Sequence, residues 1–212
     1  LAFASDDVRG EPGVEQYEQP DARAERRRAL LAVAADAPSL FDGRIAGTAT
    51  AFLTDDRDTF RDPSPALWGA PPRSVLGDRV VGARTSATWA TLPAHLPRLA
   101  VEVRRETADT DVDGRPDRHE TRLGGAAVAS DEYALLDDRL VLAAAVRLDA
   151  SSGRSPMPVP QAGVLGRPLP TLTLRANVGR VFRDPSFDEL YFDAPGLQGD
   201  PHLRPEIGRA HV

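Results

Sequence analysis

The densest group of residues able to do chemistry is an acidic stretch near the middle of the chain. The run from Asp109 to Glu120, Asp-Thr-Asp-Val-Asp-Gly-Arg-Pro-Asp-Arg-His-Glu, fits the pattern D-x-D-x-D-G-x5-E. In that pattern carboxylates at loop positions one, three, five and twelve bind Ca²⁺, and the glycine allows a sharp turn. The candidate calcium ligands are Asp109, Asp111, Asp113, Asp117 and Glu120. A solvated acidic turn is the other interpretation, since Pro116 and strand-like flanks depart from the usual motif.

Catalytic constellations are not found. The sequence has no G-x-S-x-G, P-loop, H-E-x-x-H or dinucleotide-binding glycine pattern. Its four histidines, His95, His119, His202 and His211, do not pair at metal-ligand spacing, and the absence of cysteine excludes thiolate sites and disulfides. We therefore predict no enzyme, no catalytic residue and no required cofactor, with calcium at 109–120 as the one possible ion.

Composition leaves two classes of protein open. The chain has 212 residues and a net charge of −6, with 41% hydrophobic but only 6% aromatic residues. The acidic balance and the lack of a basic block argue against a nucleic-acid partner. The longest apolar run, Leu140 to Val146, is far shorter than the roughly 18 residues of a membrane helix. The chain is thus either soluble or a membrane β-barrel, whose alternating strands escape hydropathy analysis.

Period-two alternation predicts strands almost everywhere. In Arg44 to Thr54, Ile45, Gly47, Ala49, Ala51 and Leu53 share one face, and threonines share the other. The same alternation of apolar and polar residues recurs along the chain. It predicts about nine strands, at 1–5, 26–36, 44–54, 79–91, 99–106, 121–135, 139–149, 157–167 and 171–181.

The connections alternate in length. Long ones are expected at 6–25, 55–78, 107–120 and 183–206, a medium one at 150–156, and short ones at 37–43, 92–97, 136–138 and 168–170. Long loops on one side and tight turns on the other are typical of an outer-membrane barrel. Arg, Glu, Thr and Asn on the polar faces would be costly in a dry sandwich core but suit a water-filled lumen. Trp89, Tyr133 and Phe52 are the candidates for interfacial aromatic residues.

The last third of the chain carries two linked motifs. Leu172 to Tyr191 reads LTLRANVGRVFRDPSFDELY, and Gly199 to Glu206 reads GDPHLRPE. They resemble the "LRASYGRGFRAPSFDELY" strand and loop and the "GNPDLKPE" phrase of TonB-dependent outer-membrane receptors. Asp131-Glu132-Tyr133 with Leu140 to Leu148 is similar to the hairpin that precedes that strand. Asp184, Val181, Asp200 and His202 depart from the usual residues of these motifs.

This resemblance implies energy-coupled import across the bacterial outer membrane. Such receptors are barrels of about 22 strands, filled by an N-terminal plug that contacts the TonB complex. Their cargo is siderophore-bound iron, haem, cobalamin or an oligosaccharide. The loop after the strand supplies the ligand-contact candidates, which are Arg183, Asp184, Phe187, Asp188, Glu189 and Tyr191. A purely structural role for the same loop is the preferred alternative, because its prolines stop strand pairing and its acids can cap a turn.

Both ends of the sequence indicate a cut. Leu1 to Ser5 reads as the tail of a strand, and neither the plug, the energy-coupling segment nor an aromatic-ended C-terminal strand is recognisable. Residues 207–212 read IGRAHV, which resembles the translation of a sequencing adapter. We therefore expect a partial barrel at 1–206 and a non-native tail at 207–212.

The prediction is an all-β, antiparallel transmembrane barrel segment with long extracellular loops and short periplasmic turns. Its partners would be a small-molecule or metal-chelate cargo, outer-membrane lipid and the TonB complex, and the segment alone would not transport. The alternative is a soluble extracellular β-domain with a structural calcium loop at 109–120. Partitioning between buffer and detergent distinguishes the two.

Overall fold

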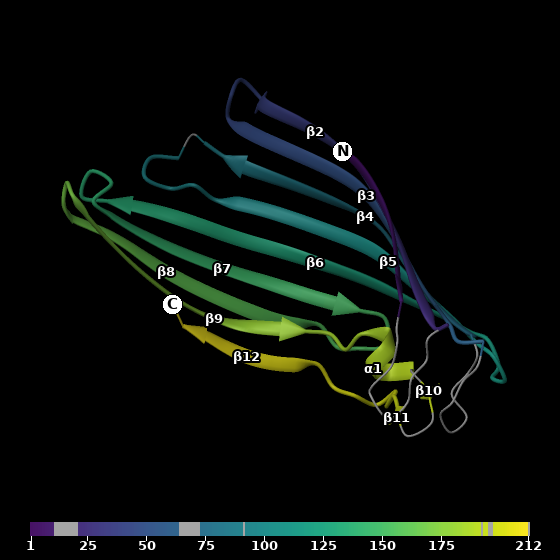
Figure 1. Cartoon of the computed structure of the whole chain (residues 1–212). Helices are drawn as coiled ribbons and strands as arrows, with labels where there is room; N and C mark the ends of the chain where they lie inside the picture. The colour runs from purple at the N-terminus through teal and green to yellow at the C-terminus, as the bar shows by residue number, and fades with distance from the viewer. Residues whose placement is uncertain (11–20, 64–72, 91, 192, 195–196, 212) are drawn as a thin grey trace.

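One curved antiparallel sheet makes up nearly the whole molecule (Figure 1). The computed structural model describes residues 1–10, 21–63, 73–90, 92–191, 193–194 and 197–211. Ten strands follow one another in chain order: β1 (Ala2–Gly10), β2 (Arg23–Leu40), β3 (Ile45–Arg61), β4 (Arg73–Trp89), β5 (Arg98–Val112), β6 (Arg118–Leu135), β7 (Leu140–Ser151), β8 (Met157–Leu169), β9 (Leu172–Arg183) and β12 (Glu206–His211). Between β9 and β12 lie a short helix α1 (Phe187–Tyr191) and a small hairpin of β10 (Asp193–Ala194) and β11 (Leu197–Gln198).

The predicted meander is confirmed. Each of the nine expected strands is present, and each of β1 to β8 pairs with the next strand in sequence. A tenth strand, Glu206–His211, pairs with β9 and includes most of the segment expected to be a non-native tail. The origin of residues 207–212 stays a prediction. The sheet is open, with β1 and β12 as its two edges.

Several strands are longer than expected, so the loops are shorter. β5 continues to Val112 and β6 begins at Arg118, which reduces the predicted loop at 107–120 to a turn at 113–117. Likewise β3 continues to Arg61 and β4 begins at Arg73, where the sequence predicts a loop at 55–78. These strand ends carry charged residues, which are typical of loops. Their side chains nevertheless alternate across the sheet and their backbones stay paired. The predicted loop at 6–25 is shortened in the same way, because β1 continues to Gly10 and β2 begins at Arg23; residues 11–20 lie outside the described residues.

The sheet has one polar and one apolar face. Because successive side chains point to opposite faces, the register fixes which residues share a face. Arg84 of β4 lies opposite Glu102 of β5, and Glu106 lies opposite Arg122 of β6, so these belong to the polar face. Helix α1 follows β9 yet contacts Arg122 of β6 through its Phe187 ring. It can reach β6 only across the inside of the curve, so the polar face is the inner face.

The outer face carries an uninterrupted apolar band, which we call the outer band. Its side chains are exposed, since the sheet is a single layer and few side chains are buried. On β3 the outer band runs from Ile45 to Leu53, the length that a tilted strand needs to cross a bilayer. The residues that define it include Leu31, Val33 and Ala35 of β2, Ala49 and Leu53 of β3, Val81 of β4, Leu99, Val101 and Val103 of β5, Leu123 of β6, Leu142, Val146 and Leu148 of β7, and Leu172, Leu174 and Val178 of β9.

Aromatic residues lie at the short-turn end of the outer band. Trp89 and Tyr133 are both on the outer face there, and the Tyr133 ring stacks on His95 at 4.3 Å. Phe52 lies instead on the inner face, over the position where Gly82 has no side chain. The expectation of an interfacial Phe52 is therefore wrong, because its even position on β3 turns it inward. No described helix is long and apolar enough to span a bilayer.

Prolines explain the two irregularities in the ladder. The register shifts between Ala37 and Leu40 and again between Gly166 and Leu169. Pro38 and Pro168 fall inside these intervals. A proline has no N–H to donate to the neighbouring strand, so the pairing slips there. Both slips lie next to the short turns, at the end opposite α1 (Figure 1).

Candidate functional site

A ladder of ion pairs crosses the inner face from β4 to β6; we call it the inner ladder. Arg84 Nε donates to Glu102 Oε2 at 2.8 Å, and Arg104 Nη1 donates to Glu102 Oε1 at 3.1 Å. Arg104 Nε donates to Glu106 Oε1 at 2.5 Å, and Arg122 Nε donates to Glu106 Oε2 at 2.7 Å. Each glutamate therefore bridges two guanidinium groups on adjacent strands, and this fixes the inner wall between them.

Sequence analysis does not single out the inner ladder. Glu102 is only 8% exposed, unlike the solvated charges expected on a lumen wall. The only trace of the inner ladder in the sequence is Glu102-x-Arg104-x-Glu106, in which three charged residues occupy every second position of one strand. Only the register of the neighbouring strands places Arg84 and Arg122 against these acids, so their pairing could not be predicted from one strand alone.

Helix α1 begins with a capping box. The Ser186 hydroxyl accepts from the Glu189 N–H at 3.2 Å, and a Glu189 carboxylate oxygen accepts from the Ser186 N–H at 2.8 Å. Such reciprocal bonds satisfy N–H groups left open at a helix start. Arg183 Nη2 also donates to Glu189 at 2.6 Å, and this hydrogen bond holds the pKa of Glu189 below its usual value. The carboxylate of Glu189 therefore stabilises the loop through its bonds to Arg183 and Ser186.

Arginines of β6 and of the turn between β7 and β8 hold α1 and the residues before it. Arg122 Nη1 donates to the Pro185 carbonyl at 2.8 Å, and its guanidinium lies 4.8 Å from the centre of the Phe187 ring. Arg118 Nη1 donates to the Tyr191 carbonyl at 3.3 Å. Arg154 Nη1 donates to Asp184 at 2.5 Å. The inner face of β6 and the turn between β7 and β8 therefore fix this loop at Asp184, Pro185 and Tyr191.

The six ligand-contact candidates thus lie together but have different roles. Arg183, Asp184 and Glu189 are engaged in ion pairs within the loop or with the sheet. Phe187 and Tyr191 contact each other, with ring centres 6.3 Å apart. Asp188 is exposed and makes no ion pair with any described residue. Ligand contact by any of the six stays a prediction, and Asp188 is the one whose charge is not already used.

Asp188 lies beside other carboxylates of the inner face. Loss of part of its hydration to the neighbouring protein raises the pKa of the exposed Asp188, and the nearby charges of Asp58 and Glu189 raise it further. The negative charge of Asp188 also acts on Asp78 of β4 and raises the pKa of Asp78, in addition to the effect of burial. This group of acids gives the inner face a negative field next to α1, which favours cations over anions. Among the described residues, however, no three acidic or histidine side chains are arranged to hold a metal ion.

The predicted calcium ligands are spread over two strands and a turn. Asp109 and Asp111 lie on the outer face of β5, where Asp109 binds His119 at 2.5 Å and Asp111 binds Arg73 at 2.7 Å. Asp113 and Asp117 are exposed in the turn, and Glu120 lies on β6 opposite Ala108, on the inner face. The structure does not bring the five carboxylates together. Calcium binding by this segment stays a prediction.

An open antiparallel sheet with an apolar outside and a charged inside is the wall of a large β-barrel. Comparison with protein families shows to which family this barrel wall belongs. The model of the TonB-dependent receptor-like β-barrel family matches residues 99–211, and the chain belongs to this family. A comparison with curated proteins found no match.

Solved structures share the fold at low sequence identity. The chain is similar to the copper transporter OprC, with a TM-score of 0.71 and 16% identity over 91% of this chain. It is also similar to a double mutant of the Serratia marcescens haemophore receptor HasR in complex with its haemophore HasA and haem, with a TM-score of 0.70 and 16% identity over 93% of this chain. Both are named as transporters or receptors and not as enzymes. The match covers 38% of the OprC chain and 36% of the HasR chain, so this chain spans less than half of either.

Proposed function

We propose that this chain forms part of the wall of a bacterial outer-membrane receptor that imports a scarce nutrient, driven by the TonB complex. The cargo class is siderophore-bound iron, haem, cobalamin or an oligosaccharide. Copper and haem are named for the two similar structures and support a metal-containing cargo. Energy coupling would act through a plug and TonB-contacting region outside this sequence, and the chain alone would not transport.

The observation that carries the proposal is the division of the sheet into two faces. The outer band holds only apolar and small side chains over a membrane-crossing length, as on Ile45 to Leu53. The inner face holds the ion pairs of the inner ladder, which need water or protein beside them. A soluble sandwich would bury its apolar face under a second sheet, and no such layer occurs among the described residues.

A pair of spin labels tests which face meets lipid. The sequence lacks cysteine, so single cysteines can be introduced at Val101 on the outer face and at its neighbour Ala100 on the inner face. The chain refolded into vesicles should show label accessibility to oxygen at position 101 and to a water-soluble nickel chelate at position 100. Equal exposure of both labels to the nickel chelate would contradict the proposal. If the chain were also a soluble monomer without detergent, that would support the alternative of an extracellular calcium-binding β-domain.

Import is tested in the cell that produces the protein. Deleting its gene should slow growth when iron, haem, cobalamin or an oligosaccharide is limiting, and restoring the gene should reverse the defect. The same defect should appear when the inner-membrane energy complex is disabled. If growth is normal on every one of these nutrients at limiting supply, the import proposal is wrong even where the labels place the outer band in lipid.

A further inference from the structure

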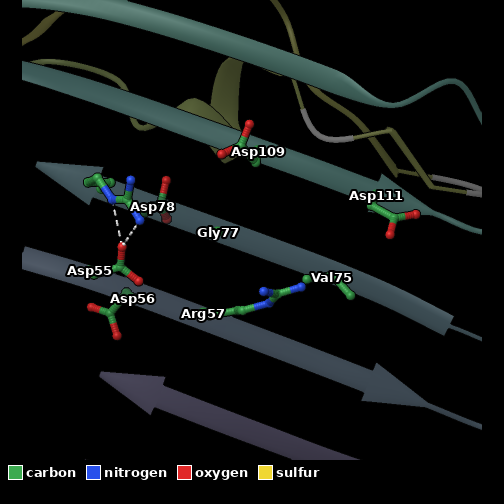
Figure 2. Close-up of a pocket in the computed structure, with 9 residues that line it drawn as sticks. Asp55, Asp56, Arg57, Val75, Gly77, Asp78, Asp109 and Asp111 are labelled. Carbon is green, nitrogen blue, oxygen red and sulfur yellow. Dashed lines mark hydrogen bonds and ion pairs between the residues drawn. The ribbon is translucent and has the colours of Figure 1, made fainter. Parts of the chain in front are cut away.

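Two hollows of the sheet differ in character. The one at the α1 end spans β3 to β5 and is lined by five aspartates and two arginines, and its Asp55 accepts from Arg79 at 2.6 Å (Figure 2). The other lies on the outer face at the short-turn end and is lined mainly by apolar side chains; we call it the turn groove. It has a volume of about 680 Å³ and runs across β5, β6 and β7 beside Trp89 of β4.

Small side chains form the floor of the turn groove. Leu99, Ala129 and Val146 lie side by side across β5, β6 and β7, and Ala144 occupies the next outer-face position towards the short turns. The two alanines leave a recess in the outer band between the larger side chains of Leu99 and Val146. Atoms that line an unfilled recess lack dispersion contacts on one side, so an acyl chain that enters it is stabilised.

One charge lies at the edge of the turn groove. Asp131 follows Ala129 on the outer face of β6 and lies opposite Ala144. Arg98 also lines the turn groove, but its guanidinium lies on the inner face, where Nη2 donates to Ser86 Oγ at 3.3 Å. Asp131 is therefore the one charged side chain that the described residues present to the turn groove from the outer face.

The carboxylate of Asp131 has room for a further donor. Its Oδ2 accepts from His95 Nδ1 at 2.7 Å, and its Oδ1 accepts from the Leu96 N–H at 3.2 Å. A carboxylate offers about four lone-pair sites, so about two remain. The side chain is 40% exposed, so these sites can be reached. A neutral His95 donates a hydrogen bond but leaves the negative charge of Asp131 in place.

Asp131 lies at the depth of lipid head groups. Trp89 lines the same groove and Tyr133 occupies the next outer-face position of β6, and such aromatic residues mark the boundary between hydrocarbon and water. Leu99 is the outer-band residue of β5 nearest the short turn. Asp131 comes two residues after its partner Ala129, about 7 Å along the strand at about 3.3 Å per residue. A lipid whose chain enters the turn groove therefore brings its head group to Asp131.

We propose that the turn groove binds a phospholipid with a primary ammonium head group, whose ammonium donates to Asp131 and whose acyl chain lies on Ala129 and Ala144. The ammonium complements both the charge and the open acceptor sites of the carboxylate. Continuity with the outer band favours a lipid over a soluble amine, because one molecule then contacts both surfaces. The inference rests on the proposed function, since the outer band must face lipid.

The test measures quenching of Trp89 fluorescence by brominated lipids in vesicles that contain the refolded chain. Trp68→Phe leaves Trp89 as the one tryptophan of the sequence. The vesicles hold phosphatidylethanolamine and phosphatidylglycerol in equal amounts, with bromine on the acyl chains of one lipid and then of the other. The relative binding constant from quenching should be about fivefold higher for phosphatidylethanolamine, as expected for a partly exposed ionic hydrogen bond.

Two variants separate the head-group contact from the acyl-chain contact. Asp131→Asn should remove the preference, because an amide has no charge to hold the ammonium. Its matched control is Glu132→Gln, since Glu132 is the next residue of β6 but lies on the inner face. Ala129→Leu keeps Asp131 but fills the turn groove, and it should lower the preference too. Its matched control is Ala127→Leu, since Ala127 is an exposed alanine of the same face outside the turn groove.

Four outcomes overturn the inference. Equal quenching by the two brominated lipids would show that the ammonium is not selected. An unchanged preference in Asp131→Asn would show that this carboxylate does not hold it, and an equal loss in Glu132→Gln would reduce the effect to general charge. Equal quenching by brominated phosphatidylcholine, whose head group has no N–H, would exclude the proposed hydrogen bond. If the spin labels at positions 100 and 101 report the expected faces while any of these occurs, the inference fails and the proposed function stands.

Discussion

Single residues set the geometry of the short turns. Phe41, Asp42 and Gly43 all have left-handed backbones, and Gly43 has a φ of 82°. Gly43→Ala should destabilise the chain by about 1–2 kcal/mol, because a Cβ is disfavoured in that conformation. Space is not the cause, since the nearest atom to an added Cβ is Ser39 Oγ at 3.7 Å. Urea unfolding in detergent micelles measures the change. Gly166→Ala is the control, because Gly166 has an ordinary backbone and no atom within 4 Å; an equal loss there would contradict the explanation.

The half-buried charges of the inner ladder should matter more than exposed charges elsewhere on the sheet. Glu106→Gln removes the charge that bridges Arg104 and Arg122 and should cost about 1–3 kcal/mol of unfolding free energy. The equivalent change Asp7→Asn breaks an exposed pair with Arg9 and should cost about 1 kcal/mol or less. Urea unfolding of both variants in the same micelles compares them. Equal effects would mean that water screens the inner ladder as fully as it screens the edge strand.

At the scale of elements, α1 should respond to pH in two opposite phases. The pKa of Asp188 is raised, so its carboxylate opposes docking at neutral pH, and docking tightens as pH falls through that raised pKa. The pKa of Glu189 is lowered, so its contribution is present above the ordinary glutamate pKa and is lost as pH falls through the lowered value. Methyl NMR of the buried Leu190 follows docking. Asp188→Asn should remove the first phase and Glu189→Gln the second; an unchanged curve in either variant contradicts the assignment.

The strands could be predicted because their pattern is local, whereas their ends could not. Alternation identifies β3 and β9 from single segments, since an apolar face needs every second residue. It does not tell where pairing ends, because Asp55 and Asp109 suit a loop as well as a strand that extends beyond the hydrocarbon. The helix α1 likewise escapes prediction. Its five residues are too few for a periodic signal, and only the spacing of Ser186 and Glu189 marks its start.

For the molecule as a whole, the sequence predicts the architecture better than the site. Fold class follows from the two faces of successive strands, which need no knowledge of distant contacts. The inner ladder and the docking of α1 depend on pairs such as Arg122 and Pro185, separated by 63 residues. The register between strands decides which charges meet, and a one-residue slip would move each of them to the other face. Which charged residues form ion pairs is therefore decided only in the assembled sheet.

Because the sheet has a lipid-facing and a polar face, the same substitution at two neighbouring positions of one strand should have different effects. Ala34 and Ala35 are adjacent, exposed alanines of β2 that face the inside and the outside respectively. Ala35→Arg should cost about 2–4 kcal/mol in vesicles, because it places a charge near the middle of the outer band. Ala34→Arg should cost far less, because its side chain meets the polar inner face. Unfolding in lipid vesicles measures both variants. Equal destabilisation in vesicles would mean that the sheet does not separate lipid from water.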